Sequence, residues 1–138
     1  MRNKKRENIG PYHMEKVGKE SREDYLEAIY ILISRYGNSI RSCDLAEHMG
    51  VTRPSVCNAL ARLKSESLVN MDEKHNITLT EEGYQEAINI LGRHHFFEYI
   101  LIQAGVDAET ANKEACALEH AISHDSFVRL RSRWASTF

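Results

Sequence analysis

The sequence predicts a mainly α-helical protein in which a winged helix-turn-helix is followed by a second helical region. Apolar residues recur at helical spacing along most of the chain, and only two prolines and seven glycines are present. Residues 41–66 have the pattern of a helix, a short turn that contains Gly50, and a second helix. A hairpin pattern follows directly at 68–79, which is the position of a wing.

The composition is typical of a folded protein in water. The chain has 138 residues, 42% hydrophobic and 28% charged, which suits one or two small domains. No apolar run approaches the roughly 18 residues that a membrane span needs. The charged N-terminus, MRNKKREN, is not followed by the apolar segment of a signal peptide. We therefore expect a cytoplasmic protein with no membrane partner.

The cysteines are not expected to form disulfides in a reducing compartment. Cys43, Cys57 and Cys116 are an odd number and lie far apart in the sequence. Such cysteines are more readily explained as free thiols or metal ligands than as disulfides. The simplest interpretation of Cys57 is a small packing residue.

The first elements are an arm and a helix. Residues 1–20 are polar and interrupted by glycine, and they predict a flexible basic arm. Ser21 is the expected N-cap of a helix over 22–36, which Gly37 ends. The apolar stripe of this helix consists of Tyr25, Leu26, Ile29, Leu32, Ile33 and Tyr36.

The helix-turn-helix carries the candidate DNA contacts. A helix over 41–49 ends at Gly50, and Thr52 caps a third helix that runs to about Ser67. The second helix of this motif lies in the major groove, where its N-terminal residues reach base edges and phosphates. A protein-interaction module built from three helices is the alternative. The candidate DNA-contact residues are Thr52, Arg53, Pro54, Ser55 and Asn58, with Lys74 at the tip of the wing.

The rest of the chain is the wing and three helices. Residues 68–71 and 77–79 alternate around a polar turn and predict the hairpin. Helices are expected at about 81–103, 107–123 and 125–136. We therefore divide the chain into the arm, a winged helix-turn-helix DNA-binding domain at 21–80, and a helical domain at 81–138.

The charge differs between the two halves. Residues 1–80 contain 13 Lys and Arg and 11 Asp and Glu, a net charge of +2, whereas residues 81–138 contain 5 and 9, a net charge of −4. This asymmetry favours a first half that faces phosphate and a second half that holds cations.

Three predicted helices carry groups of metal-ligand type. Cys116, Glu119 and His120 are spaced i, i+3 and i+4, so they share one helix face. A thiolate, a carboxylate and an imidazole together suit a divalent transition ion. The alternatives are that Cys116 is a core residue and that the charged residues form a solvated face. The other candidate pairs are His94 with Glu98 and Asp24 with Glu27, and Ala28 and Ile31 share the polar face of the second pair.

Five stretches of the chain resemble the diphtheria-toxin-repressor family of metal-dependent repressors, especially its short manganese-transport-regulator branch. The resemblance runs from about Glu23 to Trp134. The stretches are EDYLEAIY (23–30), DLAEHMGVTRPSVCNALARL (44–63), LTEEGYQEA (79–87), GRHHFFEYIL (92–101) and EACALEHAIS (114–123).

The resemblance implies a set of metal ligands. Cys116 follows the iron branch of the family, whereas Asp24 and Glu27 follow the manganese branch. An ancillary site of the iron branch corresponds to His94 and Glu98 but has a histidine where this chain has Asn112. The implied primary ligands are Asp24, Glu27, His94, Cys116, Glu119 and His120.

The resemblance also implies a function. A metal-loaded homodimer would bind a palindromic operator and repress metal-uptake genes, with the divalent ion as co-repressor. A soft thiolate at Cys116 favours Fe2+, with Mn2+ the runner-up. The chain is too short for the SH3-like domain of the iron branch, and no small-molecule substrate is expected.

Homodimerisation is expected through 107–136 and the long helix, because their faces are apolar or rich in alanine. Formation of the monomer's own core is the alternative. The residues that suggest the dimer include Ala111, Ala115, Leu118, Ile122, Phe127, Leu130 and Trp134.

Two alternative functions belong to other classes. A metal-dependent hydrolase could use the same ligands to activate water, but no substrate-binding loop is evident. A metal-independent winged-helix regulator could use Cys116 as a redox sensor.

Overall fold

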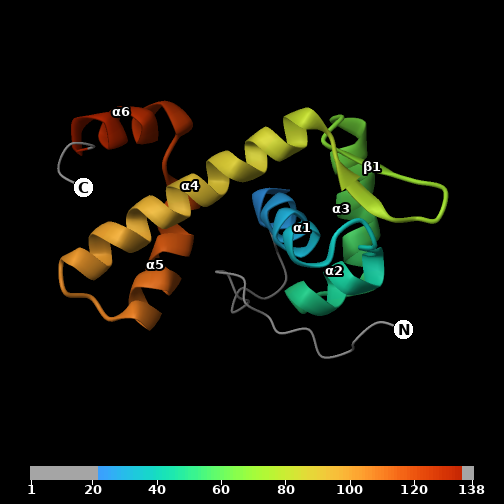
Figure 1. Ribbon diagram of the computed structural model, residues 1–138, viewed down its shortest axis with the longest axis horizontal. Coiled ribbons are helices and arrows are strands. Elements are labelled where there is room, and N and C mark those ends of the chain that lie inside the picture. Colours follow the sequence, from blue (N-terminus) through green and yellow to red (C-terminus); the bar gives the residue numbers. More distant parts are fainter. Residues whose placement is uncertain (1–21, 135–138) are drawn as a thin grey trace. The chain divides into compact units, whose positions relative to one another are not determined.

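The computed structural model describes residues 22–134, which form six helices and a two-stranded antiparallel sheet (Figure 1). The mainly helical class is confirmed, and the predicted elements are present at or close to their expected boundaries. The arm and Ser21 lie outside the described residues. The elements are α1 (Arg22–Tyr36), α2 (Ser42–Met49), α3 (Arg53–Ser65), β1 (Val69–Met71), β2 (Ile77–Leu79), α4 (Glu81–Gln103), α5 (Ala108–Ala121) and α6 (His124–Trp134).

The chain divides into two compact units, the first ending at Ile88 and the second beginning at Asn89. The dividing point therefore lies within α4. We call residues 22–88 the first unit and residues 89–134 the second unit. Among the helices of these residues, none combines the length and apolar character that a membrane span requires.

The first unit is a helical bundle with a hairpin attached. Helix α1 contacts α2, α3 and β2, and α3 contacts α2 and β1. The backbone N–H of Ile77 donates to the carbonyl of Ile40 at 2.7 Å, which joins β2 to the segment between α1 and α2. The largest fully buried apolar side chains of this unit are Leu26, Ile29, Leu32, Ile40, Leu45, Met49, Val56, Leu63 and Ile77.

The turn of the helix-turn-helix is fixed by local chemistry at both helix ends. Gly50 adopts a left-handed φ of 71°, and its N–H donates to the carbonyl of Ala46 at 2.9 Å. Thr52 caps α3, since its side-chain oxygen accepts from the backbone N–H of Ser55 at 3.2 Å. The sequence therefore sets where α2 stops and where α3 starts.

Helix α3 ends slightly before the predicted position. Its last residue is Ser65, whereas the expectation was an end near Ser67. Ser67 has a φ of 62°, in the left-handed region, which turns the chain out of the helix and toward β1. This turn gives the hairpin its starting direction.

The wing is a short hairpin with a closed tip. Figure 1 shows the wing as a narrow projection that extends beyond the helices of the first unit. Its register pairs Val69 with Leu79 and Met71 with Ile77. At the tip, the carboxylate of Asp72 accepts from the N–H groups of Lys74 and Asn76 at 2.8 and 2.9 Å. The hydrogen bonds from Asn76 contribute most to lowering the pKa of Asp72.

The second unit is built around three aromatic rings. The core residues are Phe97 of α4, Ala115 of α5 and Phe127 of α6, and Phe96 packs against them. The rings of Phe96 and Phe127 meet nearly edge to face, with centroids 5.5 Å apart and planes at 79°. This core holds α5 and α6 against the second half of α4.

Two packing interpretations need correction. Cys57 is exposed, so its interpretation as a packing residue is wrong. It lines a hollow of about 240 Å³ with Ser42, Leu60, Ala61, Lys64, Val69 and Met71. Three residues of the predicted dimer faces, Ala111, Ala115 and Phe127, are buried within a single chain.

Candidate metal centre and nucleic-acid interface

Helix α5 presents three candidate ligands together near its C-terminus. Cys116, Glu119 and His120 each offer a ligand atom, and these atoms all lie within 4.8 Å of one another. The side chain of Glu119 is fully buried, Cys116 is buried, and His120 is partly exposed. The predicted spacing along the helix therefore does bring the three groups to one place.

A histidine from α4 meets the same carboxylate. His94 Nδ1 lies 2.9 Å from Glu119 Oε1, and His120 Nε2 lies 3.1 Å from Glu119 Oε2. The other ring nitrogen of His94 lies 2.9 Å from Asn112 Oδ1 and 3.7 Å from Glu98 Oε1. The carboxylate of Glu119 thus lies between two imidazoles.

The donors of this cluster fit a divalent transition ion. Two imidazoles, one carboxylate and one thiol are the ligand types that Fe2+, Mn2+, Co2+ and Zn2+ accept in proteins. Glu98 lies at the edge of the cluster with about one third of its side chain exposed. Asn112 occupies the position where the iron branch has a histidine, and its amide oxygen holds His94.

A buried arginine supports the cluster, and the sequence interpretation missed it. Arg93 Nε donates to the backbone carbonyl of Glu119 at 2.8 Å. This contact ties the last turn of α5 to α4, and it places a buried positive charge beside the backbone that carries Glu119. A signal was present in the sequence, because Ile90, Arg93 and Phe97 all lie on the buried stripe of α4. A charged residue on an apolar stripe indicates a specific partner.

The two carboxylates of α1 are also buried. Asp24 is 2% exposed and Glu27 is 0% exposed, and Ala28 on the same helix is buried as well. The expectation that something packs on this otherwise polar face is confirmed. Ionised carboxylates are costly to bury unless a positive charge or hydrogen bonds compensate them. A bound cation is one form that this compensation can take.

The candidate DNA contacts lie on the exposed side of the first unit. Thr52, Arg53, Pro54, Ser55 and Asn58 are all exposed at the start of α3, and Lys74 is exposed at the tip of the wing. Thr52 is also the N-cap of α3, and its hydroxyl donates to Ser55 Oγ at 3.0 Å. The first turn of α3 has no acidic residue, which favours an approaching phosphate.

The burial of Cys116 argues against the alternative in which this residue is a redox sensor. A sensing thiol has to be accessible to its oxidant, and Cys116 is buried, whereas Cys43 and Cys57 are exposed. Its position beside Glu119 and His120 instead favours ligation.

Two domain families match consecutive parts of the chain. Residues 19–77 match the N-terminal DNA-binding domain of iron-dependent repressors. Residues 80–135 match the metal-binding and dimerisation domain of iron-dependent repressors. The two matches meet at the end of the wing.

Whole proteins and solved structures are also similar to the chain. An uncharacterised HTH-type transcriptional regulator of Methanocaldococcus jannaschii is 38% identical over 81% of this chain and 90% of its own length. The transcriptional regulator MntR of Escherichia coli is 34% identical over 79% of this chain and 70% of its own length. The structure of the manganese regulator SloR superimposes with a TM-score of 0.71 at 29% identity, over 86% of this chain and 55% of that one. The chain therefore spans little more than half of that solved structure.

Proposed function

Because the chain belongs to the iron-dependent repressor family, the family of the diphtheria-toxin and manganese-transport regulators, we propose that it is a metal-dependent repressor of transcription. The members of this family are DNA-binding regulators and not enzymes, so the hydrolase alternative is not supported. In this proposal a divalent ion is the co-repressor. The metal-loaded protein binds operator DNA in the cytoplasm and controls metal-uptake genes.

The observation that carries the proposal is that four candidate ligand side chains lie close together within the second unit. Cys116, Glu119 and His120 meet on α5, and His94 reaches the same carboxylate from α4. The proposed set also contains Asp24 and Glu27, on the strength of the family resemblance and their burial on α1. Glu98 is proposed as a peripheral ligand, because it lies 3.7 Å from His94.

Residues of this chain would couple ion binding to DNA binding. A bound cation would neutralise the clustered carboxylates and hold the ligand helices at fixed separations. Glu119 lies between the two imidazoles, and Arg93 fixes the backbone that carries Glu119. Helix α3 then presents Asn58 and Arg53 to base edges, and Lys74 contacts a phosphate beside them.

A homodimer fits this mode of reading DNA. Two recognition helices one helical turn apart on the duplex read a palindrome, so the operator should have two inverted half-sites. Several large apolar side chains of the second unit remain exposed in the single chain, which supports a partner surface there. They are Tyr99, Ile102, Leu118 and Trp134.

For the identity of the co-repressor ion, the proposal favours Fe2+, with Mn2+ the runner-up. The matching domains are described as iron-dependent, whereas SloR is described as a manganese regulator. Cys116 provides a soft ligand that favours Fe2+ over Mn2+, and the carboxylates of Asp24 and Glu27 favour a hard ion with a higher coordination number. The two influences oppose each other within one ligand set.

A titration of DNA binding with different ions tests the proposal. A duplex selected from a random pool would be titrated with the protein in chelator and then with Mn2+, anaerobic Fe2+, Co2+ and Zn2+, and bound metal would be counted for each ion. We expect at least a roughly tenfold rise in affinity with the cognate ion, which is about 1.4 kcal/mol of coupling. Equal affinity in chelator and with every ion would contradict the proposal.

A further inference from the structure

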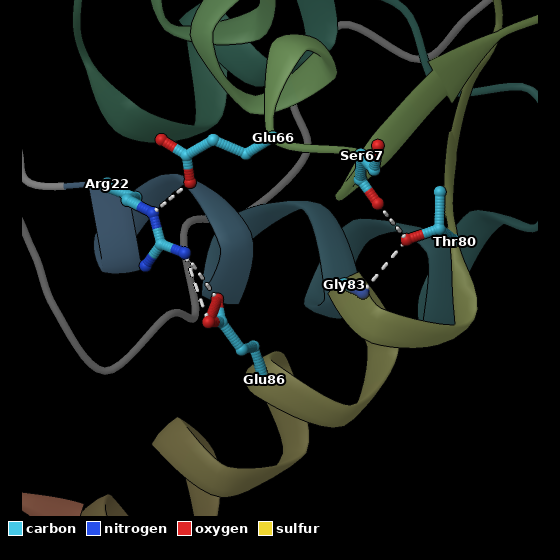
Figure 2. Close-up of polar contacts among 6 residues, drawn as sticks. All are labelled: Arg22, Glu66, Ser67, Thr80, Gly83 and Glu86. Carbon is cyan, nitrogen blue, oxygen red and sulfur yellow. Dashed lines mark hydrogen bonds and ion pairs between the residues drawn. The ribbon is translucent and has the colours of Figure 1, made fainter.

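One arginine joins three helices where the wing meets α4 (Figure 2). Arg22, the first residue of α1, donates from Nε to Glu66 Oε1 at 2.7 Å and from Nη2 to the two carboxylate oxygens of Glu86 at 2.9 and 3.0 Å. Glu66 is the C-cap of α3, and Glu86 lies in the second turn of α4. A single planar guanidinium therefore connects the first turn of α1 to the end of the recognition helix.

Hydrogen bonds hold together the two backbone segments that carry these glutamates, the end of α3 and the start of α4. The N–H of Glu66 donates back into the last turn of α3. Thr80, which precedes α4, donates its hydroxyl to the carbonyl of Ser67 at 2.7 Å, and the same oxygen accepts from the N–H of Gly83 at 3.0 Å (Figure 2). These contacts fix the segment that follows α3 against the start of α4.

At Gly83 the start of α4 approaches the segment that follows α3 unusually closely. A Cβ placed on Gly83 would lie 2.0 Å from the carbonyl oxygen of Leu68. The first turn of α4 thus approaches the chain after α3 at a distance that only glycine permits. Because the two backbones are in close contact here, Glu66 and Glu86 lie on segments that are fixed relative to each other. Arg22 binds to both of these segments.

Stability is a weak explanation for the Arg22 contacts. The side chains of Arg22, Glu66 and Glu86 are 33%, 37% and 41% exposed, so solvent and salt screen their attraction. Partial burial alone would lower the pKa of Arg22, but the hydrogen bonds to Glu66 and Glu86 outweigh this and raise the pKa. What distinguishes the contact is its place between α1 and α3.

We propose that Arg22 is a positioning residue that transmits ion binding on α1 to the recognition helix α3. The proposal rests on the proposed function, because it takes Asp24 and Glu27 as ligands on the same helix. When these carboxylates hold an ion, the first turn of α1 is held with them. Arg22 then fixes the position of Glu66, and with it the C-terminal end of α3. Without the ion, the first turn of α1 lacks this additional restraint, although the helix still packs against α2, α3 and β2.

The test separates coupling from binding. Arg22→Gln removes both ion pairs, and Arg35→Gln removes the same charge from the exposed last turn of the same helix as a matched control. For each full-length protein, Mn2+ and Fe2+ affinity would be measured without DNA. The affinity for the selected duplex would then be measured in chelator and with saturating ion. The readout is the ratio of the two DNA affinities, which is the coupling factor.

We expect Arg22→Gln to reduce the coupling factor from at least about tenfold to about threefold or less, while metal affinity changes by less than about twofold. Arg35→Gln should retain the wild-type ratio. An Arg22→Gln protein that binds metal and keeps the wild-type ratio would overturn the proposal. If the wild type itself bound metal with no change in DNA affinity, the proposed function would fail instead, so the two failures are distinguishable.

Arg22→Lys keeps the inference falsifiable if Arg22→Gln does not fold. Lysine retains the charge but has no planar fork to hold Glu66 and Glu86 at once. We expect it to lose most of the coupling factor, and Glu66→Gln to lose a similar share. Full coupling in Arg22→Lys and in Glu66→Gln would each contradict a transmitting role.

Discussion

Helices α3 and α5 carry the two candidate sites, and they place polar side chains in opposite environments. The candidate residues of α3 are exposed in its first turns, where a large partner can reach them. Glu119 and Cys116 are buried in the last turns of α5, where a large partner does not touch them directly. The difference teaches that substitutions at exposed base-reading positions of α3, such as Asn58, should affect recognition alone, whereas substitutions of the buried candidate ligands of α5 should affect both ligation and stability.

Glu119→Ala should have the largest effect of the substitutions that separate the two helices. It removes the carboxylate between His94 and His120, so we expect loss of the metal response in DNA binding. We also expect the free energy of unfolding of the metal-free protein to fall by about 1–3 kcal/mol, because His94 loses a buried partner. Metal titration and chemical denaturation measure the two effects. Glu114→Ala, at an exposed position of α5, is the control and should change neither.

Asn58→Ala tests the opposite side of the comparison. We expect it to relax base preference at one position in each half-site and to weaken specific binding by about 1–3 kcal/mol. Its effect on unfolding should stay within about 0.5 kcal/mol, because the side chain is exposed. Binding to a panel of duplexes with single base changes would measure the preference. An equal loss for specific and random DNA would show that the assignment of base-reading residues on α3 is wrong.

Cys116→Glu sharpens the account of α5 without removing the site. The substitution replaces a soft thiolate with a harder carboxylate, so activation should shift toward Mn2+ relative to Fe2+. The concentration of each ion that gives half-maximal DNA binding would be compared between the two proteins. If Mn2+ already activates the wild type at lower concentration than Fe2+ and the substitution changes nothing, Cys116 does not determine metal selectivity.

Lys74→Ala should give the smallest effect. The side chain is exposed at the wing tip, where we expect it to contact phosphate and not a base. The substitution should weaken binding to all sequences and lower the slope of log affinity against log salt concentration by about one. A base-specific loss would instead indicate that the wing reads sequence.

Local patterns in the sequence were sufficient to predict the elements of the fold. Gly50, Thr52 and the polar turn at Asp72 have chemistry that depends on near neighbours, and each ends or begins an element where expected. The spacing of Cys116, Glu119 and His120 predicted a shared helix face for the same reason.

Contacts between distant residues could not be predicted in this way. Arg22 meets Glu66 and Glu86 only because α1, α3 and α4 come together, and Arg93 reaches Glu119 only because α5 packs beside α4. The failure at Cys57 has a similar cause. Cys57 follows the buried Val56 in α3, but its own side chain is exposed among the described residues.

The most direct test of metal-gated DNA binding uses a single sample in which the ion is removed and returned. The protein would be loaded with Mn2+ or anaerobic Fe2+, and its affinity for the selected duplex measured before chelation, after chelation and after the ion is restored. The account predicts at least a roughly tenfold loss on chelation and full recovery on reloading. An affinity that is the same in all three states would contradict it.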